Sequence, residues 1–108
     1  MKLLIIARSD RGSYIGKTNE EGFSVITLDD TIDIEVGDTL SKPESWDDRD
    51  GLFLAVRNIT KNEEVNICIE NWHMSFKGAS EMLSRLGSPT KIYWLSPWPD
   101  CERSSNTW

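Results

Sequence analysis

The sequence is poor in residues that build catalytic or metal centres. It has 108 residues but only one histidine, His73, and two cysteines, Cys68 and Cys101. A pair of imidazole ligands is therefore excluded, and a Cys–His or Ser–His nucleophile would have to use His73 itself. The cysteines match no metal-ligand spacing, and we expect free thiols in a reducing compartment, whereas a disulfide would require an oxidising one. We predict no metal, no cofactor and no enzymatic activity.

Long apolar runs are also missing. No run approaches the roughly 20 residues that a membrane-spanning helix needs. The stretch Leu3 to Ala7 is shorter than the about 7 apolar residues of a signal peptide, and charged residues follow it directly. With 38% hydrophobic and 28% charged residues, the composition is typical of one folded domain. We predict a cytoplasmic protein that has no membrane partner.

A phosphate-binding loop is absent as well, although the segment "RGSYIGKT" ends in Gly-Lys-Thr. Such a loop needs four residues between its two glycines and a helix directly after it. Here Gly12 and Gly16 are separated by only three residues, and the turn "NEEG" and an apolar segment that begins at Phe23 follow. The pattern is typical of a β-hairpin with glycines at its tight positions.

Negative charge is concentrated in one third of the chain. The net charge is −6. Residues 1–18 hold four cations against one acid, residues 19–50 hold eleven acids against two cations, and residues 51–108 are balanced. Asymmetry of this kind bears on the choice of partners rather than on the fold.

Hydrophobic periodicity predicts a mainly β (α+β) fold. We expect strands over 3–7, 14–18, 23–28, 32–36, 52–60, 65–71 and 91–96. One helix is expected over residues 76–86, where the apolar stripe repeats at helical spacing after a capping Ser75 and ends at Gly87. Short links exclude parallel crossover units. The expected architecture is a small antiparallel barrel or curled sheet of about six to seven strands, with the helix packed against it.

This architecture sets the expected domain limits. Residues 1–95 should form a single compact domain, and residues 96–108 an irregular tail docked on it by its tryptophans. The segment "FSVITLDDTIDIEVGDTLS" resembles the central strands of small barrels such as the OB fold. That resemblance implies a barrel that binds oligonucleotides or similar ligands.

The acidic middle third suggests a small binding module for a basic protein, of the inhibitor, immunity or mimic type. An acidic surface of this kind would accelerate association with a basic partner. Trp46 stands among acids in the loop "SKPESWDDRDG", where burial against the sheet and a role as an interface anchor are both compatible with the sequence. The candidate partner-binding residues are Trp46, Asp47, Asp48, Asp50, Asp33 and Glu35.

Two alternatives come from other features of the chain. An OB-like barrel could bind single-stranded nucleic acid through a basic N-terminal face, on which aromatic side chains stack bases. The candidate residues for that function are Arg8, Arg11, Lys17 and Tyr14. The second alternative is self-association, as a homodimer formed through the Trp-rich C-terminal part.

Overall fold

The computed structural model describes residues 2–19, 22–41 and 53–100. Within these residues it contains seven strands and one helix. The elements are β1 (Lys2–Ser9), β2 (Ser13–Thr18), β3 (Phe23–Leu28), β4 (Thr39–Ser41), β5 (Phe53–Asn58), β6 (Glu63–Met74), α1 (Phe76–Arg85) and β7 (Ile92–Trp94).

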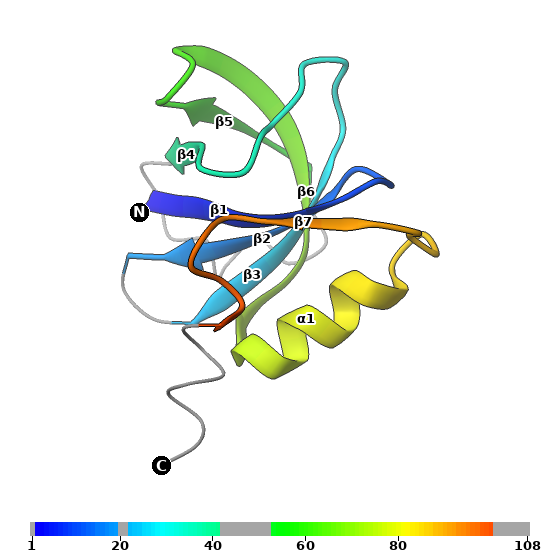
Figure 1. Cartoon of the computed structure of the whole chain (residues 1–108). Coiled ribbons are helices and arrows are strands. Elements are labelled where there is room, and N and C mark those ends of the chain that lie inside the picture. The colour runs from blue at the N-terminus through cyan, green and yellow to red at the C-terminus, as the bar shows by residue number, and fades with distance from the viewer. Residues whose placement is uncertain (1, 20–21, 42–52, 101–108) are drawn as a thin grey trace.

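Six of the described strands close into an antiparallel barrel (Figure 1). The order is β2-β3-β6-β5-β4-β1, and a further pairing of β1 with β2 joins the two ends. Strand β7 extends the sheet by pairing with the C-terminal half of β1, beyond the point where β4 pairs with its N-terminal half. The predicted small barrel with one helix is therefore confirmed.

Apolar side chains form two cores on the two faces of the barrel wall. The interior is filled by aliphatic residues together with Tyr14, which is fully buried. The second core lies between the outer face of the wall and α1. There Ala79 and Leu83 of the helix are fully buried, and the Phe76 ring packs against the rings of Phe23 and Trp94 at 5.5 and 5.7 Å between centroids.

Helix α1 begins and ends as the sequence predicts. The hydroxyl of Ser75 accepts a hydrogen bond from the backbone N–H of Gly78 at 3.0 Å, which satisfies one of the free donors of the first turn. After Leu86 the chain turns at Gly87, whose φ of +73° is accessible to glycine at little cost. The helix lies along one side of the barrel, next to β2 and β3 (Figure 1).

Gly16 lies in the middle of β2, opposite Ile5 of β1. A Cβ atom added to it would lie 2.2 Å from Cγ of Leu3, which is fully buried in the barrel interior. The glycine of the "GKT" segment is therefore required for packing between two strands. It belongs to no phosphate-binding loop, because a β-hairpin occupies this part of the chain.

A bulge in β1 reverses the direction in which its side chains point. Leu4 pairs with Lys17 and Ile5 with Gly16, but the next pairing joins Ala7 to Ile15, so that Ile6 is an extra residue. Side chains alternate between the two faces of a strand, and one extra residue shifts the alternation. Side chains before and after the bulge that would share a face in a regular strand therefore lie on opposite faces.

The strand predicted over residues 32–36 is not formed. Residues 29–38 form an irregular connection from β3 to β4 that closes one end of the barrel. The alternation still describes the side chains in part, since Ile34 is fully buried while Asp33 and Glu35 are exposed. The six-stranded closure also differs from the OB fold, which typically has about five strands, so the resemblance to that fold is not supported.

Candidate functional site

The connection 29–38, which we call the closing loop, is held to the barrel by a buried carboxylate. Asp38 is 4% exposed and accepts hydrogen bonds from the backbone N–H of Glu35 and from the side-chain amide of Asn58, both at 2.9 Å. Its carboxylate lies 3.4 Å from the ammonium group of Lys61. The backbone N–H of Ile5 in β1 donates to the Asp38 carbonyl at 2.9 Å, and the backbone N–H of Gly37 donates to the Ile5 carbonyl at 2.8 Å. The loop is therefore a fixed part of the barrel.

Asp30 anchors the other end of the closing loop. Its carboxylate accepts hydrogen bonds from the backbone N–H and the side-chain amide of Asn66 in β6, both at 3.1 Å, and from the backbone N–H of Thr31 at 2.7 Å. These bonds stabilise the ionised form and lower the pKa of Asp30, with the Asn66 backbone N–H as the largest cause. Asp30 therefore contributes stability only while it is ionised.

Acid should weaken this anchor. Because the pKa of Asp30 is lower in the folded state than its ordinary value of 3.8, its contribution is present above that value and is lost as the pH falls through the folded-state pKa. We expect Asp30→Asn to have a lower melting temperature than the wild type at neutral pH and a smaller loss on acidification. Thermal unfolding between neutral pH and pH about 2 measures both effects.

Asp29→Asn is the matched control, because the Asp29 side chain accepts none of these bonds. It should leave the melting temperature at neutral pH unchanged. An Asp30→Asn variant that follows the wild-type curve at every pH would contradict the role of this carboxylate.

The two predicted partner-binding residues in the described part of the chain, Asp33 and Glu35, project from the closing loop. Their side chains are 60% and 63% exposed. Asp33 forms an ion pair with Arg8 of β1 at 3.3 Å, and Glu35 forms one with Lys61 of the β5–β6 turn at 2.8 Å. The hydrogen bond from Lys61 to Glu35 is the largest cause of the raised pKa of Lys61. The two carboxylates are thus held in place while they face solvent.

A hollow of about 320 Å³, the Arg8 hollow, lies beside these carboxylates. It is lined by Arg8, Glu35, Val36 and Tyr93. The guanidinium of Arg8 is itself held by Asp33 and by the backbone carbonyl of Ile34. Tyr93 is 46% exposed, so that an aromatic ring, an aliphatic side chain and a carboxylate meet at one surface. Such a surface suits a long basic side chain, whose stem packs on apolar groups while its charge reaches a carboxylate.

The other four candidate residues of the acidic hypothesis lie outside the described residues. They are Trp46, Asp47, Asp48 and Asp50. Their role stays a prediction. The same is true of Cys101 and of residues 101–108 of the predicted tail, whereas Trp98 of the tail packs against the core beneath α1.

The basic residues of the N-terminal third do not form one face. Lys17 of β2 pairs with Leu4, which precedes the bulge of β1, and it lies on the outer face of the barrel wall. Arg8 lies after the bulge and reaches the closing loop. Arg11 stands in the β1–β2 turn near Gly87, at the end of α1. The bulge thus separates cations that appear close together in the sequence.

Tyr14, proposed above as a stacking residue, is fully buried in the barrel interior. Its pKa is raised, chiefly by burial. A base cannot reach its ring in this arrangement, so the structure removes Tyr14 from the candidates for stacking. Tyrosine at this position serves packing because alternation along β2 points it inward.

His73 and Cys68, the residues on which an enzymatic centre would depend, both lie in β6. His73 is exposed at the end of the strand with a φ of +53°. Cys68 is a free, half-buried thiol, whose pKa is raised chiefly by burial and also by the nearby Glu70 carboxylate. A nucleophilic cysteine needs the opposite environment, one that stabilises the thiolate.

Sequence reasoning missed part of the Arg8 hollow. Tyr93, which lines the hollow, is the middle residue of a three-residue strand, and Lys61, which pairs with Glu35 beside it, lies in a polar turn after β5; neither stands in a recognisable motif. No helix in the described part of the chain has the length and apolar character needed to cross a membrane.

The described residues form a small closed antiparallel barrel of six strands, with one extra strand and a single packed helix. Comparison with protein-family models, with curated proteins and with solved structures finds no match to the chain.

Proposed function

We propose that the chain is a small non-enzymatic binding module that engages a basic protein partner, as an inhibitor, immunity protein or mimic does. The contact surface would comprise the closing loop, the Arg8 hollow and the acidic segment with Trp46, Asp47, Asp48 and Asp50. The observation that carries the proposal is the position of Asp33 and Glu35. Both carboxylates are more than half exposed on a loop that is fixed to the barrel, beside a hollow with an aromatic wall.

The intramolecular ion pairs of these carboxylates do not prevent them from binding a partner. Surface ion pairs typically contribute only about 0–1 kcal/mol, because water solvates both charges. A partner's lysine or arginine can therefore share or replace Arg8 and Lys61 at little cost. Meanwhile, the pairs hold the carboxylates in position before binding, which lowers the entropy lost on association.

The distribution of charge supports the same partner. The eleven acids of residues 19–50 give this part of the chain a strong negative potential. Such a potential accelerates encounters with a basic surface and makes the association rate fall with added salt. The Arg8 hollow would then accept one basic side chain, with its stem against Val36 and Tyr93 and its charge on Glu35.

Charge reversal at the closing loop should weaken partner binding. We expect Asp33→Lys/Glu35→Lys to lower the affinity about tenfold or more for the protein that the wild-type chain captures from a lysate. The loop remains anchored through Asp38 and Asp30, so the melting temperature should change little. Capture followed by a titration with the purified partner measures the affinity.

Glu70→Lys/Glu81→Lys is the matched control, because it makes the same charge change at exposed residues of β6 and α1. Its affinity should stay close to that of the wild type. Equal losses of affinity in both double variants would mean that the affinity depends only on the net charge of the chain. Wild-type affinity in the closing-loop variant would remove this surface from the proposal.

A further inference from the structure

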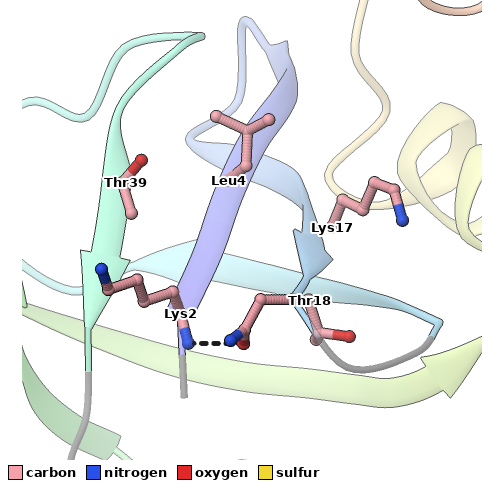
Figure 2. A pocket seen from close by; sticks show the side chains of 6 residues that line it. Lys2, Leu4, Lys17, Thr18 and Thr39 are labelled. Atoms are coloured by element: carbon pink, nitrogen blue, oxygen red, sulfur yellow. Dashed lines mark hydrogen bonds between the residues drawn. The ribbon is translucent and has the colours of Figure 1, made fainter.

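A second hollow lies on the outer face of the barrel, across β4, β1 and β2. It has a volume of about 310 Å³. Leu4 forms its floor, paired with Thr39 of β4 on one side and with Lys17 of β2 on the other. Figure 2 shows this row of three side chains, with Lys2 in the next row. We call this site the Leu4 hollow; its lining residues are Lys2, Leu4, Lys17, Thr18, Asn19 and Thr39.

The Leu4 hollow combines two cations with no acid. Among the described residues its lining contains no carboxylate, whereas Glu35 lines the Arg8 hollow and Glu81 lines a third hollow beside α1. Among the described residues, the ion pairs involve Arg8 and Lys61 but neither Lys2 nor Lys17. Within the described residues, the lining of the hollow thus carries positive charge alone, on a chain whose net charge is −6.

The strand register brings the two lysines within reach of one ligand. Lys17 lies directly opposite Leu4, and Lys2 is two residues before Leu4 on β1. Diagonal neighbours on paired antiparallel strands lie about 7–8 Å apart, which is within the span of two lysine side chains. In Figure 2 the Lys2 side chain extends toward β4 and the Lys17 side chain extends away from Leu4, so both ammonium groups reach a group bound above Leu4 only after rotation about their side-chain bonds.

The backbone of Lys2 and the side chain of Lys17 make defined contacts. The backbone N–H of Lys2 donates to the side-chain oxygen of Asn19 at 2.9 Å, and the N–H of Asn19 donates to the Lys2 carbonyl at 3.1 Å. The ammonium of Lys17 stands 5.5 Å from the centre of the Phe23 ring. Phe23 pairs with Lys17 from β3, on the side of β2 away from Leu4, so a ligand in the hollow must draw the ammonium away from the ring, a contact that is weak at an exposed site.

We propose that the Leu4 hollow binds a phosphate group, an inference that does not rest on the acidic surface. Lysine is a common ligand of phosphate groups, which its compact charge can approach from several sides. Lys2 and Lys17 supply the charge, and the hydroxyl of Thr39 supplies a further donor. Leu4 packs against the organic part of the ligand. A free nucleotide and a single-stranded nucleic acid both carry this chemistry.

An NMR titration of the ¹⁵N-labelled chain tests the site. The probes are inorganic phosphate, thymidine 5′-monophosphate and a short oligothymidylate, with acetate as a carboxylate control, each added to the wild type and to Lys2→Gln/Lys17→Gln. We expect shifts of the Lys2, Leu4, Lys17 and Thr39 amides, and an affinity about tenfold or more lower in the double variant. Lys77→Gln/Lys91→Gln removes the same charge outside the hollow and should bind as the wild type does.

The three probes distinguish the sources of phosphate. Equal affinity for the nucleotide and the oligonucleotide assigns the site to a single phosphate group, and tighter, strongly salt-dependent binding of the oligonucleotide assigns it to a strand. Either result supports the proposal. Absence of shifts with all three probes, undiminished affinity in the Lys2→Gln/Lys17→Gln variant, or equal binding of acetate would overturn it.

Discussion

Replacing Gly16 with alanine should lower the free energy of unfolding by about 1–3 kcal/mol, the usual cost of overfilling a packed core. The new Cβ would lie 2.2 Å from Cγ of Leu3 and 2.4 and 2.7 Å from its two methyl carbons. Cγ is the branch point of that side chain, so a rotation of its end cannot relieve the contact. Urea unfolding of the purified variant measures the change.

Leu3→Ala provides the control for this mechanism. Alone it should destabilise the barrel by about 2–5 kcal/mol, because it leaves a cavity. Combined with Gly16→Ala, it removes the atoms with which the new methyl group collides, so the double variant should be more stable than the sum of the two losses predicts. Additive losses, or a Gly16→Ala variant as stable as the wild type, would mean that Gly16 is not a packing position.

The second large effect is expected at Asp38. Asp38→Ala should lower the free energy of unfolding by about 3 kcal/mol, since it leaves the buried amide of Asn58 and the N–H of Glu35 without their acceptor. Asn58 is 1% exposed, so water cannot replace the lost carboxylate without a rearrangement. The closing loop should also become more mobile, which faster amide hydrogen exchange in residues 33–38 would report.

Asp33→Asn is the comparison for that experiment. It removes an exposed ion pair on the same loop and should change the stability by no more than about 0.5 kcal/mol. If Asp38→Ala lowered the free energy of unfolding as little as Asp33→Asn, the buried carboxylate would contribute little to anchoring the closing loop. The loop that carries the surface proposed for the partner would then not be held in a fixed position.

Helix α1 and the β5–β6 hairpin could be predicted because their signals are local. The apolar stripe of the helix and the cap at Ser75 lie within a few turns of chain, and the hairpin joins two alternating segments through a short polar turn. The conformation of the closing loop could not be predicted from local signals. Alternation placed Ile34 inside and Asp33 and Glu35 outside, but it could not show that this segment lacks a partner strand. Pairing depends on residues far away in the sequence.

The candidate sites were harder to predict than the fold. The extra residue Ile6 leaves no mark on the apolar run 3–7, yet it sends Arg8 to the closing loop and leaves Lys17 on the outer face. The expected basic face is therefore not formed, because Arg8 and Lys17 lie on separate surfaces. Tyr93 enters the Arg8 hollow, and Lys61 reaches Glu35 beside it, only through a pairing and a turn that the sequence does not reveal.

The footprint of the partner on the chain tests the proposed function most directly. The ¹⁵N-labelled chain would be titrated with the protein captured from a nuclease-treated lysate, and the shifted amides mapped. We expect the largest shifts in the closing loop, around Asp33 and Glu35, and at Tyr93 beside the Arg8 hollow. Shifts centred on the Leu4 hollow or α1, or a nuclease-treated capture that yields no protein, would contradict an acidic module for a basic partner.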